Sequence, residues 1–132
     1  MADMNAKHLM CRGKAKFGWV EGYFLPYYPE MRGEGPVIIS YGFDGCVKIM
    51  VDAETVTACS GLTSATGKLI YDQDIVINKS KSVAGIVEFS AEDGTFAVIN
   101  KEGEVFSFGD IESEDFYIVG NSIDNQDYLE FV

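Results

Sequence analysis

The 132-residue sequence contains little cysteine and histidine, and it has no long hydrophobic run. Its three cysteines are widely separated and form no Cys-x-x-Cys pair, which argues against a disulfide framework and against a zinc knuckle. The single histidine, His8, has no evident partner for a catalytic triad or a metal-ligand pair. The longest aliphatic runs, as at 37–39 and 75–77, are only a few residues long, far too short for a membrane-spanning helix.

Basic residues are also scarce. Ten lysines and arginines stand against 21 aspartates and glutamates, which gives a formal net charge of −11. This acidity argues against a protein that holds duplex DNA by neutralising its phosphates. No apolar stretch follows the early lysine, Lys7, so the sequence predicts no secretory signal and we expect a cytoplasmic protein.

Motifs that bind nucleotides or metals are incomplete. Five residues separate Gly61 from Gly67-Lys68, and leucine follows, whereas a phosphate-binding loop has four and then Ser or Thr. Asp72 and Asp74 begin like a calcium loop, but valine and isoleucine follow where an oxygen ligand and a glycine belong. The sequence therefore predicts no cofactor, no metal site and no catalytic residue, and we expect a protein that is not an enzyme.

Short segments rich in Val, Ile, Phe and Tyr predict a mainly β protein. We expect strands at residues 10–17, 19–28, 36–42, 46–51, 54–59, 74–78, 82–90, 95–100, 104–108 and 115–120. The Asp-Gly pair in the run 91–94 predicts a tight hairpin, because glycine supplies its left-handed backbone. Polar caps and early acids at 122–129 predict a short C-terminal helix. So many short strands favour a barrel or a sandwich, which hides sheet edges.

Charge is distributed unevenly along the sequence. Residues 1–20 carry four basic residues and one acid, whereas residues 88–132 carry twelve acids and one base. A strand at 10–17 would place its three basic side chains on one face and its apolar side chains on the other. We expect that basic face to meet acidic side chains, although the acidic run 110–115 is by itself a solvated loop. The predicted interaction surface comprises Arg12, Lys14, Lys16, Trp19, Glu112, Glu114 and Asp115.

Aromatic residues are concentrated between positions 17 and 43, and they have two interpretations. Beside three basic side chains they would stack on the bases of single-stranded nucleic acid. We favour instead a core and a subunit interface, because aromatic side chains carry large apolar areas that a small protein needs buried or covered. The eight residues are Phe17, Trp19, Tyr23, Phe24, Tyr27, Tyr28, Tyr41 and Phe43.

The central run SGLTSATGKLIYDQDIV, residues 60–76, resembles the signature TGLxDxxGKxIYEGDIV of the YopX family. Shorter matches occur in order at 12–14, 19–23, 85–89 and 118–121. Two positions depart from the family pattern, since Ser60 replaces a usual threonine and Gln73 a usual glycine. Glycine at 73 would permit a positive φ, so Gln73 predicts either a milder turn or a strained one. We interpret the signature as structural; its residues are Gly61, Leu62, Gly67, Lys68, Ile70, Tyr71 and Asp74.

The resemblance implies a mainly β protein of phage or prophage origin in a bacterial host cell, with no established activity and no catalytic residues. It implies a single YopX-like domain over 1–132, with an N-terminal β portion at 1–59 and an SH3-like barrel portion at 60–132. The additional strands would then lie in the N-terminal portion.

Three functions fit these observations. The favoured one is a noncatalytic accessory protein that binds protein and forms a homo-oligomer, with its basic strand paired to its acids in cis or across subunits. An unidentified host or phage protein would be a further partner, and no membrane is expected. The alternatives are nucleic-acid binding through the SH3-like portion and the basic strand, or an acidic mimic of nucleic acid that acts on a host DNA-binding protein.

Overall fold

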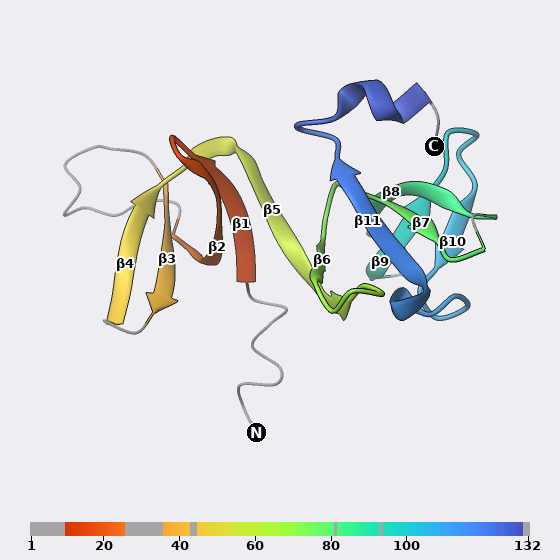
Figure 1. Cartoon of the computed structure of the whole chain (residues 1–132), viewed down its shortest axis with the longest axis horizontal. Helices are drawn as coiled ribbons and strands as arrows, with labels where there is room; N and C mark the ends of the chain where they lie inside the picture. Colours follow the sequence, from red (N-terminus) through yellow and green to blue (C-terminus); the bar gives the residue numbers. More distant parts are fainter. Residues whose placement is uncertain (1–9, 26–35, 43–44, 81, 93, 131–132) are drawn as a thin grey trace. The chain divides into compact units, whose positions relative to one another are not determined.

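The computed structural model of the chain describes residues 10–25, 36–42, 45–80, 82–92 and 94–130 (Figure 1). Strands dominate these residues, so the prediction of a mainly β protein is confirmed. The chain divides into two compact units, Met1–Cys59 and Ser60–Val132. Within the described ranges no helix is both long enough and apolar enough to cross a bilayer.

The first unit is built from antiparallel strands: β1 (Met10–Ala15), β2 (Gly18–Leu25), β3 (Val37–Gly42), β4 (Gly45–Met50) and the beginning of β5 (Asp52–Thr63). Their order in the sheet is β4-β3-β2-β1-β5, and β5 continues the sheet to β6 (Leu69–Tyr71). A two-residue turn joins β1 to β2, with Ala15 opposite Gly18. Gly18 has a φ of 136°, which a residue with a Cβ rarely adopts, so glycine closes this turn.

The core of the first unit is aliphatic and depends on close backbone approach. Val37, Ile38 and Val51 are buried. A Cβ added at Gly13 would lie 3.1 Å from the Cβ of Val51, and one added at Gly22 would lie 2.8 Å from Cγ2 of Ile38. Without side chains at these two positions, β1 and β2 can lie directly against the core.

Aromatic residues contribute less to this core than the sequence predicts. Phe17 is 73% exposed, and Trp19, Tyr23 and Phe24 are only half-buried. The reason is that glycines, not rings, occupy the inward positions of β1 and β2 next to Ile38 and Val51. The remaining aromatics of the expected cluster cannot be placed: Tyr27, Tyr28 and Phe43 lie outside the described residues, as does the side chain of Tyr41.

The second unit contains β6, β7 (Asp74–Asn78), β8 (Ala84–Ser90), β9 (Thr95–Ile99), β10 (Val105–Ser107) and β11 (Phe116–Asn121), with the 3-10 helices η3 (Ser113–Asp115) and η4 (Gln126–Glu130). Five of the strands form an antiparallel sheet in the order β10-β9-β8-β7-β11. Buried apolar side chains form its core: Ile70, Val76, Val83, Val87, Val98 and Phe116. The ring of Phe108 packs edge-on against Phe116 at 5.6 Å between centroids.

The predicted barrel is not confirmed. Among the described residues the five-stranded sheet is open, because β10 and β11 lie at its two ends and do not pair with each other. The resemblance had implied a closed SH3-like barrel in this portion. What the structure establishes is the coarser result of two antiparallel sheets, and the single-domain organisation stays a prediction.

The predicted hairpin at 91–94 is confirmed. Ser90 lies opposite Thr95, and the Gly94 amide donates to the Ser90 carbonyl at 2.8 Å. Gly94 has a φ of 69°, the left-handed conformation that the Asp-Gly pair predicts. The short C-terminal helix is also present, as η4. No strand was expected between residues 59 and 74, whereas the structure contains β6 and the extension of β5 to Thr63 in this segment.

Candidate functional site

A cluster of basic side chains surrounds Trp19 on the β1–β2 hairpin. Lys14 lies directly opposite Trp19 in the register, and Arg12 lies two residues before Lys14 on the same face. The guanidinium carbon of Arg12 is 5.0 Å from the centre of the Trp19 ring, and Nζ of Lys14 is 5.8 Å from it. Both distances fall within the range of cation–π attraction. The ring therefore holds two positive charges side by side on one face of the hairpin.

Threonines of β5 hold this arrangement in place from the neighbouring strand. Nε of Arg12 donates to Oγ1 of Thr57 at 3.1 Å, and the Lys14 amide donates to Oγ1 of Thr55 at 2.8 Å. The pairing of β1 with β5 is irregular between Arg12 and Lys14. At that irregularity the Thr55 hydroxyl, in place of a backbone carbonyl of β5, accepts the hydrogen bond from the Lys14 amide. Thr55 and Thr57 are both buried, so these hydrogen bonds fix the backbone and the Arg12 side chain.

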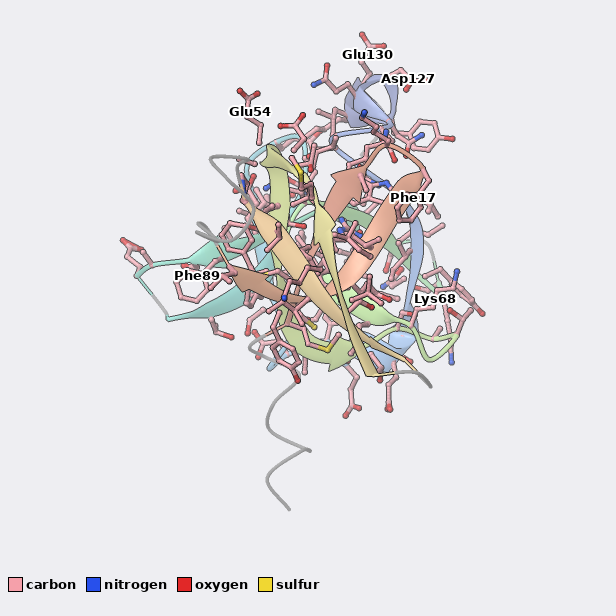
Figure 2. All side chains as sticks on the ribbon, turned by 90° about the vertical axis from the view of Figure 1, so that its left-hand side faces the viewer. Phe17, Glu54, Lys68, Phe89, Asp127 and Glu130 are labelled. Carbon is pink, nitrogen blue, oxygen red and sulfur yellow. The ribbon has the colours of Figure 1, made fainter. Side chains whose placement is uncertain are left out.

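Lys16 lies outside strand β1, unlike Arg12 and Lys14. β1 ends at Ala15, so Lys16 and Phe17 form the turn that follows, and both are exposed. Phe17, labelled in Figure 2, was expected on the apolar face of a longer strand. The structure corrects that expectation, because the tight turn at Gly18 ends the alternation two residues early.

A groove in the first unit brings Lys16 close to β4. It consists of two adjoining hollows of about 390 and about 480 Å3, which share Ala15, Lys16 and Met50 in their walls. One hollow extends to Lys14 and the other to Phe17 and Lys48. We call this feature the lysine groove, defined by Lys14, Ala15, Lys16, Phe17, Lys48 and Met50. No motif or spacing in the sequence indicates Lys48 or Met50, which reach the groove only through the pairing of β3 with β4 and the entry into β5.

The predicted acidic residues lie together in the second unit. Glu114 and Asp115 belong to η3 and Glu112 precedes it, and all three are exposed. Oδ1 of Asp115 lies 3.9 Å from Nζ of Lys79, an exposed ion pair that contributes little to stability. Pairing of these acids with Arg12, Lys14 and Lys16 stays a prediction.

Residues of the signature segment serve local geometry. Gly61 and Gly67 both have a φ of 83°, and Gly67 closes a turn in which its amide donates to the Ser64 carbonyl at 3.0 Å. Ile70 and Tyr71 are buried. Two further members of the segment differ in exposure, since Leu62 is half-buried and Lys68 is exposed (Figure 2).

Asp74 and Gln73 form the turn into β7. The buried carboxylate of Asp74 accepts a hydrogen bond from the Tyr71 amide at 2.7 Å. Gln73 has a φ of 75°, so the strained alternative of the two turns predicted for this position is the one present. Oε1 of Gln73 accepts from the Ser122 hydroxyl at 2.6 Å, and the Ser122 amide donates to the Gln73 carbonyl at 2.9 Å.

Side chains suited to binding a metal ion do not form a cluster within the described ranges. No three His, Cys, Asp or Glu side chains there are close enough to hold a metal ion. His8 lies outside the described residues. Burial raises the pKa of the half-buried Cys11 thiol, which favours its neutral and less reactive form.

Comparison with known proteins identifies the family. A search of solved structures found similarity to the X-ray crystal structure of protein yopX from Bacillus subtilis, which is 19% identical and has a TM-score of 0.49; the match covers 90% of this chain and 96% of that chain. No curated protein matches the chain. The family described as YopX protein matches residues 37–130, well over half of the chain, and Arg12, Lys14, Lys16 and Trp19 precede the matched range. The chain therefore belongs to the YopX family, whose function is unknown.

Proposed function

We propose that this YopX-family chain is a noncatalytic, protein-binding accessory protein that assembles with further copies of itself. In this proposal it is of phage or prophage origin and acts in the cytoplasm of the bacterial host cell, as the family resemblance implies. Its first unit presents the basic surface, and its second unit presents the acidic one.

One observation carries the proposal: the concentration of positive charge around Trp19 and the lysine groove of an otherwise acidic protein. Arg12 and Lys14 lie against the Trp19 ring, and Lys16 and Lys48 line the groove beside them. Residues 60–132 carry fourteen acids and four basic residues, a net charge of −10. Opposite charges on two surfaces steer association and fix its orientation.

The first test measures mass in solution as a function of salt. We expect light scattering after size exclusion to give more than one copy per particle at about 10 mM salt. The mass should fall towards one copy at about 1 M, because the screening length drops from about 30 to about 3 Å. A single-copy mass at every salt and protein concentration would refute self-assembly.

The second test reverses charge at the basic surface. Lys14→Glu with Lys16→Glu should reduce the assembled fraction, whereas Lys101→Glu makes the same kind of charge change on an exposed turn of the second unit and should leave it unchanged. Since Lys14 contacts Trp19, the single change Lys16→Glu in the exposed turn separates loss of charge from loss of fold. Circular dichroism confirms that each variant is folded. An unchanged mass in both basic-surface variants contradicts the proposal.

Nucleic-acid binding is the second candidate, and the lysines around Phe17 favour it. In this alternative, bases stack on exposed rings while cations follow the phosphates. Trp19 is poorly suited to that role, because Arg12 and Lys14 lie over its ring. Titration of labelled single- and double-stranded DNA and RNA at low and moderate salt decides the matter. Binding with a steep salt dependence supports this alternative, and absence of binding at low salt excludes it.

The acidic surface gives a related alternative, mimicry of nucleic acid. A protein with this much negative charge at 60–132 would compete with DNA for a host DNA-binding protein. Capture from host lysate with and without competing DNA distinguishes the two outcomes. Loss of the captured protein on addition of DNA supports mimicry, and retention points to a separate protein-binding surface.

A further inference from the structure

The lysine groove combines exposed apolar side chains with lysines. Phe17 is 73% exposed and Met50 is 44% exposed, although both are large apolar side chains. Met50 and Lys16 line both hollows, Lys14 lines one of them, and Phe17 and Lys48 line the other. One acid, Asp52, lines the hollow that contains Lys14. The described lining of the groove therefore combines three lysines and one acid with apolar surface that water contacts.

This chemistry defines the kind of segment that would fill the groove. Covering Phe17 and Met50 requires an apolar or aromatic side chain, which would remove apolar area from water on both partners. Methionine adapts to the shape of what it contacts, and lysine stems add further apolar area along the walls. Carboxylates beside the apolar anchor would face Lys14, Lys16 and Lys48. The groove thus fits an extended segment with apolar side chains next to several acids.

The chain itself contains such a surface, on the outer side of β11. Tyr117 and Val119 are 41% and 42% exposed. Alternation along the strand places Tyr117 on the side away from the buried Phe116, and Val119 lies at the irregularity in the pairing between Ile118 and Gly120. β11 lies at one end of its sheet among the described strands. The acids Glu112, Glu114 and Asp115 directly precede it. Three carboxylates next to two exposed apolar side chains match the three lysines and two apolar side chains of the groove.

Other exposed apolar side chains of the second unit match less well. Phe89 already packs edge-on against Phe96, with 5.3 Å between ring centroids. Val105 is 55% exposed but is the only large apolar side chain that the three-residue β10 exposes to this extent. Tyr128 is exposed near Asp127 and Glu130, but it is a single exposed apolar side chain of η4. Among the described residues of the second unit, only the β11 face joins a pair of exposed apolar residues to a group of three acids.

We propose that the lysine groove of one copy binds the outer face of β11 of a second copy, with Tyr117 as the apolar anchor. This inference rests on the proposed self-assembly and names the surfaces that carry it. Aromatic anchors in a pocket, surrounded by charged residues, are the usual pattern of residues that dominate binding energy. The ion pair between Lys79 and Asp115 is exposed and its atoms are 3.9 Å apart, so breaking it costs little free energy. Asp115 can therefore pair with a lysine of the groove instead.

Apolar variants test the anchor directly. Phe17→Ser and Tyr117→Ser change exposed side chains, so both proteins should remain folded. We expect each to weaken association at least about tenfold in sedimentation velocity. The combined variant should be scarcely weaker than either single variant, because both remove the same contact. Val105→Ser is the matched control, since it removes an exposed apolar side chain from the same unit as Tyr117 and should leave association unchanged.

Charge exchange tests the identity of the two surfaces. One variant carries Lys16→Glu with Lys48→Glu in the groove, and the other carries Glu112→Lys with Glu114→Lys before β11. Each variant alone should associate weakly, because groove and face then carry like charge. Mixed together, the two should form a complex that contains both proteins. A chain with all four changes should regain self-association.

The outcomes separate the docking mode from self-assembly itself. If the wild-type protein assembles but the Phe17, Tyr117 and charge-exchange variants behave like it, this docking mode is wrong and the proposed function stands. If the wild-type protein stays a single copy at all concentrations, both fail together. Weak association of each charge variant with no complex in the mixture also overturns the pairing of groove and β11.

Discussion

The strained turn at Gln73 gives a prediction that can be worked through with a double-mutant cycle. Its φ of 75° is the conformation for which the family signature usually has glycine. Gln73→Gly removes the strain of a side chain in the left-handed region, but it also removes the hydrogen bond from the Ser122 hydroxyl to Oε1 of Gln73. Ser122→Ala removes that same hydrogen bond and leaves the backbone angle at 73 unchanged. The hydrogen bond that Nε2 of Gln73 donates to Oδ1 of Asp72 at 3.2 Å is lost in both backgrounds and therefore cancels in the coupling.

The expected magnitudes follow from these two contributions. The left-handed conformation costs a non-glycine residue about 1–2 kcal/mol. Glycine has greater conformational freedom in the unfolded chain, which offsets about 0.5–1 kcal/mol of the stability gained by removing that strain. The hydrogen bond contributes about 1 kcal/mol. Gln73→Gly should therefore change the free energy of unfolding little in the wild-type chain and raise it by about 1 kcal/mol in the Ser122→Ala background.

Urea denaturation followed by circular dichroism measures the four free energies of unfolding. The cycle should give a coupling of about 1 kcal/mol between positions 73 and 122. Gln73→Ala provides the control, because it removes the hydrogen bond while keeping a Cβ at positive φ, and it should destabilise the protein. The reasoning is refuted if Gln73→Gly destabilises the Ser122→Ala protein, since the angle at 73 would then carry no strain.

Three further predictions concern stability and reactivity. Gly85→Ala should destabilise the protein by about 3 kcal/mol or more, because its Cβ would collide with the Ile99 carbonyl and lie 2.9 Å from Cγ1 of Val98. Gly67→Ala, with a φ of 83° and open space around the added Cβ, should cost only about 1 kcal/mol in the same urea titration, and equal losses would contradict the steric argument. Asn78→Ala should lower the free energy of unfolding by about 2–3 kcal/mol, measured by thermal unfolding. The reason is that the buried Oδ1 of Asn78 accepts hydrogen bonds from the amides of Ser82 and Val83, at 2.9 and 3.2 Å. A loss below about 0.5 kcal/mol would show that these amides find other acceptors. Burial raises the pKa of Cys11 above its ordinary value of 9.0, so the thiol ionises first in the unfolded chain and the free energy of unfolding should fall as pH rises past 9.0. Cys11→Ala should remove that part of the pH dependence, and parallel profiles for the two proteins would exclude the effect.

Local features were predictable from the sequence because each depends on neighbouring residues. The Asp-Gly hairpin, the bounds of β7 and the common face of Arg12 and Lys14 follow from turn chemistry and from alternation along a strand. The strands within the signature segment were not predicted, because glycines usually interrupt strands. In the structure Gly61 lies within β5, and only Gly67 belongs to the turn that precedes β6.

Features that depend on distant residues were not predictable in this way. Lys48 and Met50 reach the lysine groove because β4 leads into β5, which pairs with β1 some 40 residues earlier in the chain. No spacing in the sequence indicates that approach. The described aromatic side chains are less buried than predicted for a similar reason. Val51 and Ile38 pack against Gly13 and Gly22, in the part of the core where aromatic rings were expected. The sequence alone does not distinguish a glycine that permits close packing from a glycine that forms a turn, because the distinction depends on the partner strand.

The position of Trp19 makes the chain its own optical probe. Trp19 is the sole tryptophan, and it lies on the hairpin where Arg12 and Lys14 lie over its ring. Its fluorescence emission therefore reports on the unfolding of the first unit. The far-ultraviolet signal, in contrast, sums the strands of both units. Superimposable melting curves from the two signals would mean that the halves of the molecule unfold cooperatively, and separated curves would mean that each has a stability of its own.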